Sequence, residues 1–459
     1  MAAHVPVILA ELGKQVSKCY IFPVDVVILI PVLSPAWEVD LFKLYSRLAV
    51  HRVGQVDWEP HLAEFFTRIM NSFNLPVTFG GSGLVIKHGM SGSSCTGAVS
   101  KWIVYTLGPG STSMSHLSKM LRAIRSYYHP ANLNNSSEQL HGFISSLCSN
   151  FINRLHVERH INKFETKIPV EKRLRDSDVD EFVEAVTPIA WLVLYNSYEE
   201  EARTMFSSLA LISPSTIIPR LLNTLSTAAD ILTEPHRFHV CIQAVSAIAG
   251  PLVRNFPGRA IQLLNSLLPA IDVNDIWRST DIFICMSDLL EMMAVSSTIP
   301  AFTNQHHEDV EINFNFEDFV AEFISKCFNL IENSKRINVR NDAGNNEDYL
   351  NDEEIAADAA INDTFLRMCI NASPEIMSGI LSRLKSYVSG RIVEPTVAGG
   401  ILACMCRSVV MCDPVRGLAV FIPMLVSTIT SRMRERQVDS NKLDEELQFN
   451  LQLLGEWCS

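Results

Sequence analysis

The stretch ALISPSTIIPRLLNTL, residues 210–225, shows how this chain is built. Apolar residues on both sides of Pro214 recur at spacings of three and four, which is typical of amphipathic helices. Proline has no backbone N–H and fits the first turn of a helix, so it ends one helix and begins the next. The stretch therefore predicts a helix, a tight turn and a second helix that carries Leu221 and Leu222.

The same pattern of a helix, a turn with proline and a second helix recurs along the chain. Three further stretches share it: VRNFPGRAIQLLNSLL (253–268), CINASPEIMSGILSRL (369–384) and VVMCDPVRGLAVFIPML (409–425). Pro214 and Pro257 are 43 residues apart, and Pro374 and Pro414 are 40 residues apart. A spacing of this size is typical of HEAT and armadillo repeats.

These repeats predict an all-α fold, a HEAT- or armadillo-like α-solenoid of paired antiparallel helices. One helical hairpin cannot bury its apolar face alone, whereas stacked neighbours bury a continuous core. A charge at Leu222 or Leu264 is therefore expected to unfold the local repeats. Strand-like alternation is nearly absent, and we expect about sixteen helices. An irregular all-helical globule is the alternative.

Two segments, 138–155 and 178–195, show the helical pattern clearly. One apolar face of the first carries Ile144, Leu147, Phe151 and Leu155. At the start of the second, Ser177 is expected as the N-cap and Asp180 as the acidic residue three positions later.

Two polar stretches interrupt the series of helical repeats. We divide the chain into an atypical N-terminal segment, 1–50, and helical repeats over 51–333 and 355–459. The Gly/Ser-rich segment 79–97 is expected to be a flexible loop within the first array. The acidic, Asn-rich segment 334–354 is expected to be a mobile loop between the arrays.

The apolar stretch CYIFPVDVVILIPVLSPAW, residues 19–37, stands apart from the repeats. Asp25 and three prolines would break a membrane-spanning helix there. A signal peptide would carry its apolar stretch nearer the start, followed by a small-residue cleavage site. We expect a buried segment or an atypical gene-model start rather than a membrane role.

Composition narrows the class of protein. Hydrophobic residues make up 47% and charged residues 19%, which is typical of a well-buried soluble chain. The 38 Lys and Arg against 50 Asp and Glu leave a net charge of −12, which argues against a general nucleic-acid binder. Eleven cysteines are scattered singly, and Cys404 and Cys406 lack the CxxC spacing, so we expect free thiols in a reducing compartment.

The sequence FINRLHVERH, residues 151–160, offers the first candidate site. His156 and His160 are four residues apart, so both imidazoles reach one side of a helix. Glu158 falls on the far side, and the order differs from the HExxH of zinc proteases. We interpret the segment as a solvated helix end that runs into a basic linker, 154–175. A metal site and a basic patch for an acidic partner or a polyphosphate stay open as alternatives.

Two further groups could bind metal by residue type. His236 and His239 follow Pro235 and fall in the first turn of a predicted helix, where their spacing alone is a weak signal. An acidic run could bind calcium but lacks the ligand order and central glycine of an EF-hand. It comprises Glu347, Asp348, Asp352, Glu353, Glu354 and Asp358. We interpret this run as a solvated loop.

The glycines of 79–97 are the candidate phosphate cradle. The chain has no GxxxxGK[ST] string, and Gly81 and Gly83 lack the third glycine and the βαβ pattern of a dinucleotide fingerprint. No GxSxG nucleophile elbow is present either. We therefore assign no catalytic, cofactor-binding or metal-binding residue and expect no enzyme. A metallohydrolase built on His156 and His160 is the competing hypothesis from the enzyme class.

Seven strings occur in an order that resembles one known family. They are SKWIVYTLGPGS (100–111), RSYYHPANLNNSSEQLHGFISSLCSNFINRLHVERH (125–160), DVDEFVEAVTPIA (178–190), DILTEPHRFHVCIQAV (230–245), LLPAIDVNDI (267–276), FNFEDFVAEFISKCFNLIE (314–332) and LDEELQFNLQLLGEW (443–457). Together they resemble the middle part of the large HEAT-repeat proteasome activators, the proteasome activator complex subunit 4 or Blm-type family. The resemblance runs from about Trp58 to Trp457, and residues before about Val50 do not match.

The resemblance implies a wall segment of a very long α-solenoid that caps the α-ring of the 20S proteasome core. Family members open its gate without ATP or ubiquitin. They are linked to degradation of peptides and acetylated histones, to DNA repair and to sperm development. The resemblance also implies localisation in the nucleus and cytoplasm. From the residues themselves we expect no cofactor, no membrane and no direct nucleic-acid contact.

The chain also departs from the family pattern. The family's gate-opening element is an aromatic C-terminal tail, whereas this chain ends LGEWCS, in what we expect to be mid-solenoid. The acetyl-lysine-binding region of the family also lies outside the matching part. No family functional residue is therefore carried onto this sequence, which is expected to form about a quarter of such a protein. A HEAT-repeat scaffold for other proteins, without a proteasome role, is the alternative function.

Overall fold

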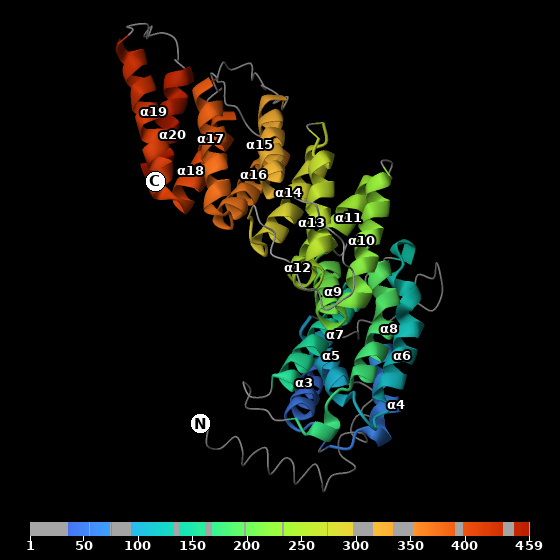
Figure 1. Ribbon diagram of the computed structural model, residues 1–459. Helices are drawn as coiled ribbons and strands as arrows, with labels where there is room; N and C mark the ends of the chain where they lie inside the picture. Colours follow the sequence, from blue (N-terminus) through green and yellow to red (C-terminus); the bar gives the residue numbers. More distant parts are fainter. Residues whose placement is uncertain are drawn as a thin grey trace. The chain divides into compact units, whose positions relative to one another are not determined.

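The computed structural model is built of helices (Figure 1). It describes residues 35–54, 56–73, 75, 93–132, 137–160, 168–196, 199–231, 234–272, 274–296, 315–333, 352–390, 398–434 and 445–458. These residues contain 18 α-helices, α3 to α20, and no strand apart from one isolated bridge. The predicted all-α fold is confirmed. The chain forms two compact units, unit 1 (Met1–Ser213) and unit 2 (Pro214–Ser459).

Unit 1 stacks its helices in two layers (Figure 1). The bounds are α3 (Pro35–His51), α4 (Leu62–Ser72), α5 (Ser93–Thr106), α6 (Ser113–Ile124), α7 (Ser137–Arg159), α8 (Asp176–Val193) and α9 (Glu199–Ile212). Helices α3, α5, α7 and α9 contact one another in series, and α4, α6 and α8 form a second series. Alternate helices therefore pack together, as stacked antiparallel hairpins require.

Aromatic rings fill the core of unit 1. The Trp58 ring lies 5.8 Å from Tyr45 of α3 and 5.8 Å from the fully buried Trp102 of α5. Phe151 of α7 stacks on Phe182 of α8, with 3.7 Å between ring centroids. Edge-to-face and stacked pairs add to the apolar area that they bury. Helix α3 therefore belongs to the packed array, although it lies mostly within the N-terminal segment set apart in the sequence.

Unit 2 has the same two-layer arrangement. Its bounds are α10 (Pro214–Asp230), α11 (Pro235–Ala247), α12 (Ala249–Asn255), α13 (Pro257–Leu267), α14 (Ile276–Glu291), α15 (Phe316–Asn333), α16 (Asp352–Ile370), α17 (Pro374–Gly390), α18 (Ala398–Cys412), α19 (Pro414–Arg434) and α20 (Glu445–Cys458). Helices α11, α14, α16, α18 and α20 contact one another in series. Helices α15, α17 and α19 form a second series (Figure 1).

The four repeat prolines each begin a helix, as predicted: α10, α13, α17 and α19 start at Pro214, Pro257, Pro374 and Pro414. The residue seven positions after each proline is at most 4% exposed: Leu221, Leu264, Leu381 and Phe421. Two full turns of helix separate that residue from the proline, so the same face is buried in each repeat. Leu222 is only half-buried, so the sequence interpretation that placed it in the stacked interface is wrong and Leu221 takes that place.

Gly417 sets how closely α19 approaches α18. A Cβ atom at Gly417 would lie 3.0 Å from Val410 Cγ2 and 3.1 Å from Val410 Cα. We expect Gly417→Ala to lower the free energy of unfolding by about 1–2 kcal/mol, because overpacking against backbone outweighs the ~1 kcal/mol helical preference for alanine. Thermal unfolding followed by circular dichroism measures the change.

Gly379 of α17 is the matched control for this substitution. It also lies within a helix, but a Cβ atom there would meet nothing within 4 Å. Gly379→Ala is therefore expected to raise the free energy of unfolding by about 0.5–1 kcal/mol. Changes of the same sign in the two variants would contradict the close approach at Gly417.

Backbone and side-chain hydrogen bonds link neighbouring turns of unit 2. The Val295 N–H donates to the Asn371 carbonyl at 2.9 Å, and the Ser373 N–H donates to the Val295 carbonyl at 2.7 Å. Asn371 Nδ2 donates to the Leu290 carbonyl at 2.8 Å. The segment after α14 is therefore fixed against the turn that joins α16 to α17.

The start of α8 differs from the sequence prediction. The helix begins at Asp176, and the Arg175 N–H donates to Asp178 Oδ2 at 2.9 Å. The expected N-cap Ser177 and acidic Asp180 are therefore wrong by two residues. Asp178 accepts the N–H three residues before it, which is the role predicted for Asp180.

The predicted loops overlap described helices at one end. Helix α5 begins at Ser93 inside segment 79–97, and α16 begins at Asp352 inside segment 334–354. The other residues of both segments lie outside the described residues, as do residues 19–34 of the apolar N-terminal stretch.

Candidate functional site

A buried ion pair lies where FINRLHVERH ends α7. Arg154 is fully buried and Glu158 is 5% exposed. Arg154 Nε donates to Glu158 Oε1 at 2.7 Å, and Glu158 Oε2 accepts the Leu174 N–H at 2.8 Å. The predicted solvated helix end is therefore wrong for these two side chains. It is right for Arg159 and His160, which are exposed.

The Arg154 guanidinium joins three parts of unit 1. Its Nη1 donates to the carbonyls of Val104 at 2.6 Å and Leu107 at 2.8 Å, at the end of α5. Its Nη2 donates to the Lys172 carbonyl at 3.1 Å. A cation at the carboxyl end of a helix complements the helix dipole. The Val104 carbonyl also accepts the Leu107 N–H at 3.4 Å, so the guanidinium is its second donor. We call Arg154, Glu158 and these partners the Arg154 clamp.

Gly108 makes the close approach at this clamp possible. Its φ of +129° lies in a region that residues with a side chain rarely adopt. A Cβ atom there would lie 3.3 Å from the Lys172 carbonyl oxygen and 3.5 Å from Arg154 Nη2. Gly108, the first of the two glycines in SKWIVYTLGPGS, therefore serves the fold of unit 1.

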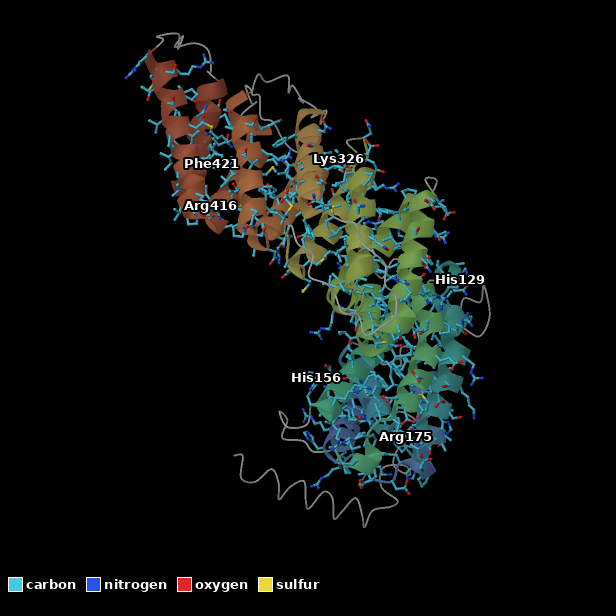
Figure 2. All side chains as sticks on the ribbon, in the orientation of Figure 1. His129, His156, Arg175, Lys326, Arg416 and Phe421 are labelled. Carbon is cyan, nitrogen blue, oxygen red and sulfur yellow. The ribbon has the colours of Figure 1, made fainter. Side chains whose placement is uncertain are left out.

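His156 of α7 and His160, the residue directly after the end of α7, lie side by side, as predicted. Their ring centroids are 4.7 Å apart, and Figure 2 labels His156. Glu158 is turned inward to Arg154 and does not join them. Within the described ranges, no three His, Cys, Asp or Glu side chains are gathered as a metal site. The two imidazoles alone provide fewer ligands than a zinc site requires.

The string YYHPAN fixes the turn between α6 and α7. Tyr128 is fully buried, and its hydroxyl donates to the Leu140 carbonyl at 2.8 Å. Asn196 Nδ2 donates to the Tyr128 carbonyl at 2.8 Å and lies 2.9 Å from His141 Nε2. The neighbouring His129, labelled in Figure 2, is exposed. Tyr128 of this string therefore helps to hold the helices of unit 1 together.

In unit 2, His239 pairs with a carboxylate that the sequence interpretation missed. His239 Nδ1 lies 2.6 Å from Asp281 Oδ2, and the His236 and His239 ring centroids are 6.4 Å apart. Ser246 donates to Asp288 in the same way between α11 and α14. Both contacts join residues 42 positions apart. The two pairs could therefore have been predicted from the sequence by comparing polar residues one repeat period apart.

Asp288 lies in a group of charges where α11, α14 and α16 meet. Burial raises the pKa of the Asp288 carboxyl, and the negative charges of Glu291 and Asp363 raise this pKa further. The Ser246 hydroxyl and the Arg367 guanidinium oppose that shift. Arg367 Nη1 also bonds Glu291 Oε1 at 2.6 Å, which links α16 to α14.

Asp288→Asn is expected to raise the melting temperature of unit 2 at pH 7. A raised pKa means that the fold favours the protonated carboxyl. The protonated Asp288 carboxyl stabilises the fold fully at pH values below its ordinary pKa of 3.8. This stabilisation is lost as the pH rises through the pKa of the carboxyl in the folded state. Asparagine stays neutral and still accepts the Ser246 hydroxyl. Thermal unfolding from pH 7 downward should show the two proteins converging, and a constant difference would contradict this cause.

The buried cysteines of the described segments are poor nucleophiles. Burial raises the pKa of the Cys148 thiol to about 12 and also raises the pKa of the thiols of Cys285, Cys327, Cys369 and Cys406. Only a thiolate attacks an electrophile or binds a metal, so these side chains stay unreactive at neutral pH. They act as apolar core residues.

Comparison with known proteins gives one consistent family. The family model for the mid HEAT repeats region of Proteasome activator complex subunit 4 matches residues 117–314 and 303–458. The human Proteasome activator complex subunit 4 is 31% identical over 438 residues, which is 92% of this chain and 24% of the human protein.

Relatives from a fish and a plant are also similar to this chain. The zebrafish (Danio rerio) Proteasome activator complex subunit 4B is 31% identical over the same shares of the two chains. The Arabidopsis thaliana Proteasome activator subunit 4 is 22% identical over 433 residues, which is 86% of this chain and 23% of that protein. The chain therefore spans about a quarter of the length of these curated relatives.

Proposed function

Because this chain belongs to the proteasome activator complex subunit 4 family, we propose that it is a non-catalytic solenoid segment of an activator that binds the proteasome. The match to the family's mid HEAT repeats region over residues 117–314 and 303–458 carries the proposal. The chain covers 24% of the human relative, so the activity and partners of the whole protein are part of the proposal.

The finer features of the proposal follow the family. The assembled protein caps the α-ring of the 20S core without ATP or ubiquitin and promotes degradation of peptides and acetylated histones. It acts in the nucleus and the cytoplasm, in DNA repair among other processes. In this arrangement the present segment forms part of the wall of the solenoid. It adds surface and length to that wall.

The geometry of the described residues supports a non-catalytic role. The Arg154 clamp, the Tyr128 network and the His239–Asp281 pair all join helix to helix or helix to turn. The buried thiols of Cys148 and Cys285 stay protonated because burial raises their pKa. These titratable groups therefore belong to the packing that holds the stack of helices together. Stacks of this kind generally present a broad curved surface to their partners.

A chimera tests the proposal. The matching quarter of the human relative is replaced by this chain, and the chimera is purified and checked for helicity and size. Co-sedimentation with purified 20S particles and hydrolysis of a fluorogenic peptide without ATP are then measured. We expect the folded chimera to bind the particles and to stimulate hydrolysis, with the unmodified human protein measured in parallel.

The same experiment separates the alternative scaffold function. A HEAT-repeat scaffold without a proteasome role would give a folded chimera that neither binds 20S particles nor stimulates hydrolysis. This outcome would contradict the proposal. A chimera carrying Leu264→Asp is the control for a damaged stack, because Leu264 is fully buried in α13. Zinc analysis of the chain tests the metallohydrolase hypothesis separately, which predicts one bound zinc at His156 and His160.

A further inference from the structure

Helix α14 carries a partly exposed stripe of mixed apolar and acidic residues. The helix contacts both α11 and α16, and Figure 1 labels it within unit 2. Trp277 is 60% exposed and Ile284 is 43% exposed. Alternating spacings of four and three complete the stripe: Trp277, Asp281, Ile284, Asp288 and Glu291. We call these five residues the α14 stripe.

Arg278, the residue after Trp277, does not add its charge to this stripe. Its guanidinium lies 4.4 Å from the centroid of the Phe238 ring, and its Nη2 donates to the Ala229 carbonyl at 3.3 Å. The cation is therefore turned toward α10 and α11, which contain these two residues. The Trp277 ring stays accessible to the side chain of a partner, and tryptophan is one of the residues that contribute most to binding at interfaces.

Three carboxylates gather at the other end of the stripe. The side chains of Glu291 and of Asp363 in α16 are 44% and 49% exposed. Burial and the negative charges of Glu291 and Asp363 raise the pKa of the Asp288 carboxyl, so the three groups lie close enough to repel one another. Arg367 bonds Glu291 at 2.6 Å and Asp363 at 3.5 Å. One guanidinium against three carboxylates leaves these four side chains with a net negative charge.

The charges of unit 2 are unevenly divided between its two series of helices. By sequence, α11, α14, α16, α18 and α20 contain eleven Asp and Glu residues and four Lys and Arg residues. Helices α15, α17 and α19 contain five acidic and six basic residues. The negative charge is therefore a property of the series that contains α14, and it does not follow evenly from the net charge of −12.

The α14 stripe is complementary to a cationic partner. The face of the Trp277 ring attracts a Lys or Arg side chain, and the carboxylates around Glu291 attract a second one. Ile284 offers an apolar contact between them. Trp277, Ile284 and Glu291 follow at intervals of seven residues, or about 10 Å along the helix. A segment in the polyproline II conformation places every third side chain on one side at intervals of about 9 Å, which matches this spacing.

Two other occupants fit the α14 stripe less well. A partner helix that packed along α14 would set apolar side chains against Asp288 and Glu291, and an acidic group covered in this way is costly. A nucleic acid would bring phosphates next to the same carboxylates and would be repelled.

We propose that the α14 stripe binds an extended, cationic segment of another polypeptide. The segment carries Lys or Arg at two positions six residues apart and an apolar residue midway between them. One cation lies on the Trp277 ring, the apolar side chain contacts Ile284, and the second cation lies among Asp288, Glu291 and Asp363. The inference does not depend on a proteasome role, because it rests on α14 and α16 and is tested on this chain alone.

Seven-residue peptides provide the probe. Arg-Pro-Pro-Leu-Pro-Pro-Arg and Glu-Pro-Pro-Leu-Pro-Pro-Glu share a conformation and carry opposite charges. Each is labelled with fluorescein, and binding to the intact chain is followed by fluorescence anisotropy at low salt concentration. The arginine peptide is expected to bind about tenfold more tightly than the glutamate peptide, and added salt should reduce this difference.

Variants at the two ends of the stripe test the two cation contacts. Trp277→Ala is expected to weaken binding of the arginine peptide about fivefold. Trp277→Phe should keep most of the affinity, because a phenylalanine ring also attracts a cation. Glu291→Lys should remove the preference for the arginine peptide, since it replaces one of the three carboxylates with a cation.

Two exposed positions elsewhere in unit 2 provide matched controls. Met411→Ala removes a large apolar side chain that is 64% exposed, and Glu322→Lys makes the same charge change on α15. Both should leave the affinity and the preference unchanged. Equal binding of the two peptides to the wild-type chain, or unchanged binding to Trp277→Ala, would overturn the proposal. An equal loss of preference in Glu322→Lys and Glu291→Lys would overturn it as well, because the peptides would then respond to the overall charge of the chain.

Discussion

Replacing Arg154 with methionine is expected to lower the free energy of unfolding of unit 1 by about 3–5 kcal/mol. Methionine keeps much of the side-chain volume but leaves Glu158 as an uncompensated buried charge. The carbonyls of Leu107 and Lys172 also lose the guanidinium as their donor, and the Val104 carbonyl keeps only the longer bond from the Leu107 N–H at 3.4 Å. A buried acceptor without a partner costs about 1–3 kcal/mol, which adds to the loss of the ion pair. Urea unfolding followed by circular dichroism measures the effect.

Two variants control this experiment. Arg159 lies in the same helix and pairs with Asp176 at 3.2 Å, but both side chains are mostly exposed, so Arg159→Met is expected to cost less than about 0.5 kcal/mol. Adding Glu158→Gln to Arg154→Met should recover part of the loss, because it removes the unpaired charge. Equal stability of Arg154→Met and Arg159→Met would show that the clamp does not hold unit 1 together.

The second large effect is expected from Leu264→Asp in unit 2. Leu264 is fully buried at the seventh position after Pro257. The variant loses the leucine contacts, which is worth about 2–5 kcal/mol, and places a carboxylate in an apolar interface. We expect α13 and the helices that contact it, α12 and α14, to unfold locally or to lose at least about 4 kcal/mol. Far-ultraviolet circular dichroism and thermal unfolding detect either result.

Gln262 provides the matched position for that variant. It lies two residues before Leu264 in the same helix and is exposed. Gln262→Asp introduces the same charge on the solvent side and is expected to change the free energy of unfolding by less than about 0.5 kcal/mol. Retained helicity and an unchanged melting curve in Leu264→Asp would contradict the assignment of this face to the stack.

The repeat architecture could be predicted because its signals are local. A proline in the first turn and an apolar face at spacings of three and four depend only on neighbouring residues. Pro257 therefore marked the start of α13, and Leu264 was correctly placed in the interface. The choice between Leu221 and Leu222 failed because a shift of one residue turns the side chain by about 100°, which paired leucines do not reveal.

The Arg154 clamp could not be predicted for a different reason. An arginine and a glutamate four positions apart usually form an exposed pair on a helix surface. Arg154 is buried because acceptors come from Val104, 50 residues earlier, and from Lys172, 18 residues later. Only the assembled fold brings these carbonyls to one point. The sequence therefore indicated the charges but not the acceptors that allow one of them to be buried.

In the candidate site, too, a feature set by neighbouring residues was predicted, whereas a feature set by distant residues was missed. The shared face of His156 and His160 is a local property of the helix and was predicted correctly. The bond between His239 and Asp281 crosses 42 residues and was missed, although the repeat period contained the necessary register. The strings that resemble the family mark places where helices and turns are fixed, as Tyr128 and Gly108 show.

Amide hydrogen exchange of the intact chain, measured by mass spectrometry, tests the central claim that the chain is a stack of repeats of about forty residues. In the wild-type protein, the inner turns around Leu221, Leu264 and Leu381 should exchange most slowly within unit 2. In Leu264→Asp, exchange should accelerate in α12, α13 and α14, while α5 and α7 of unit 1 keep their wild-type rates. Fast exchange at these turns in the wild type, or uniform acceleration across both units in the variant, would contradict the stacked-repeat account.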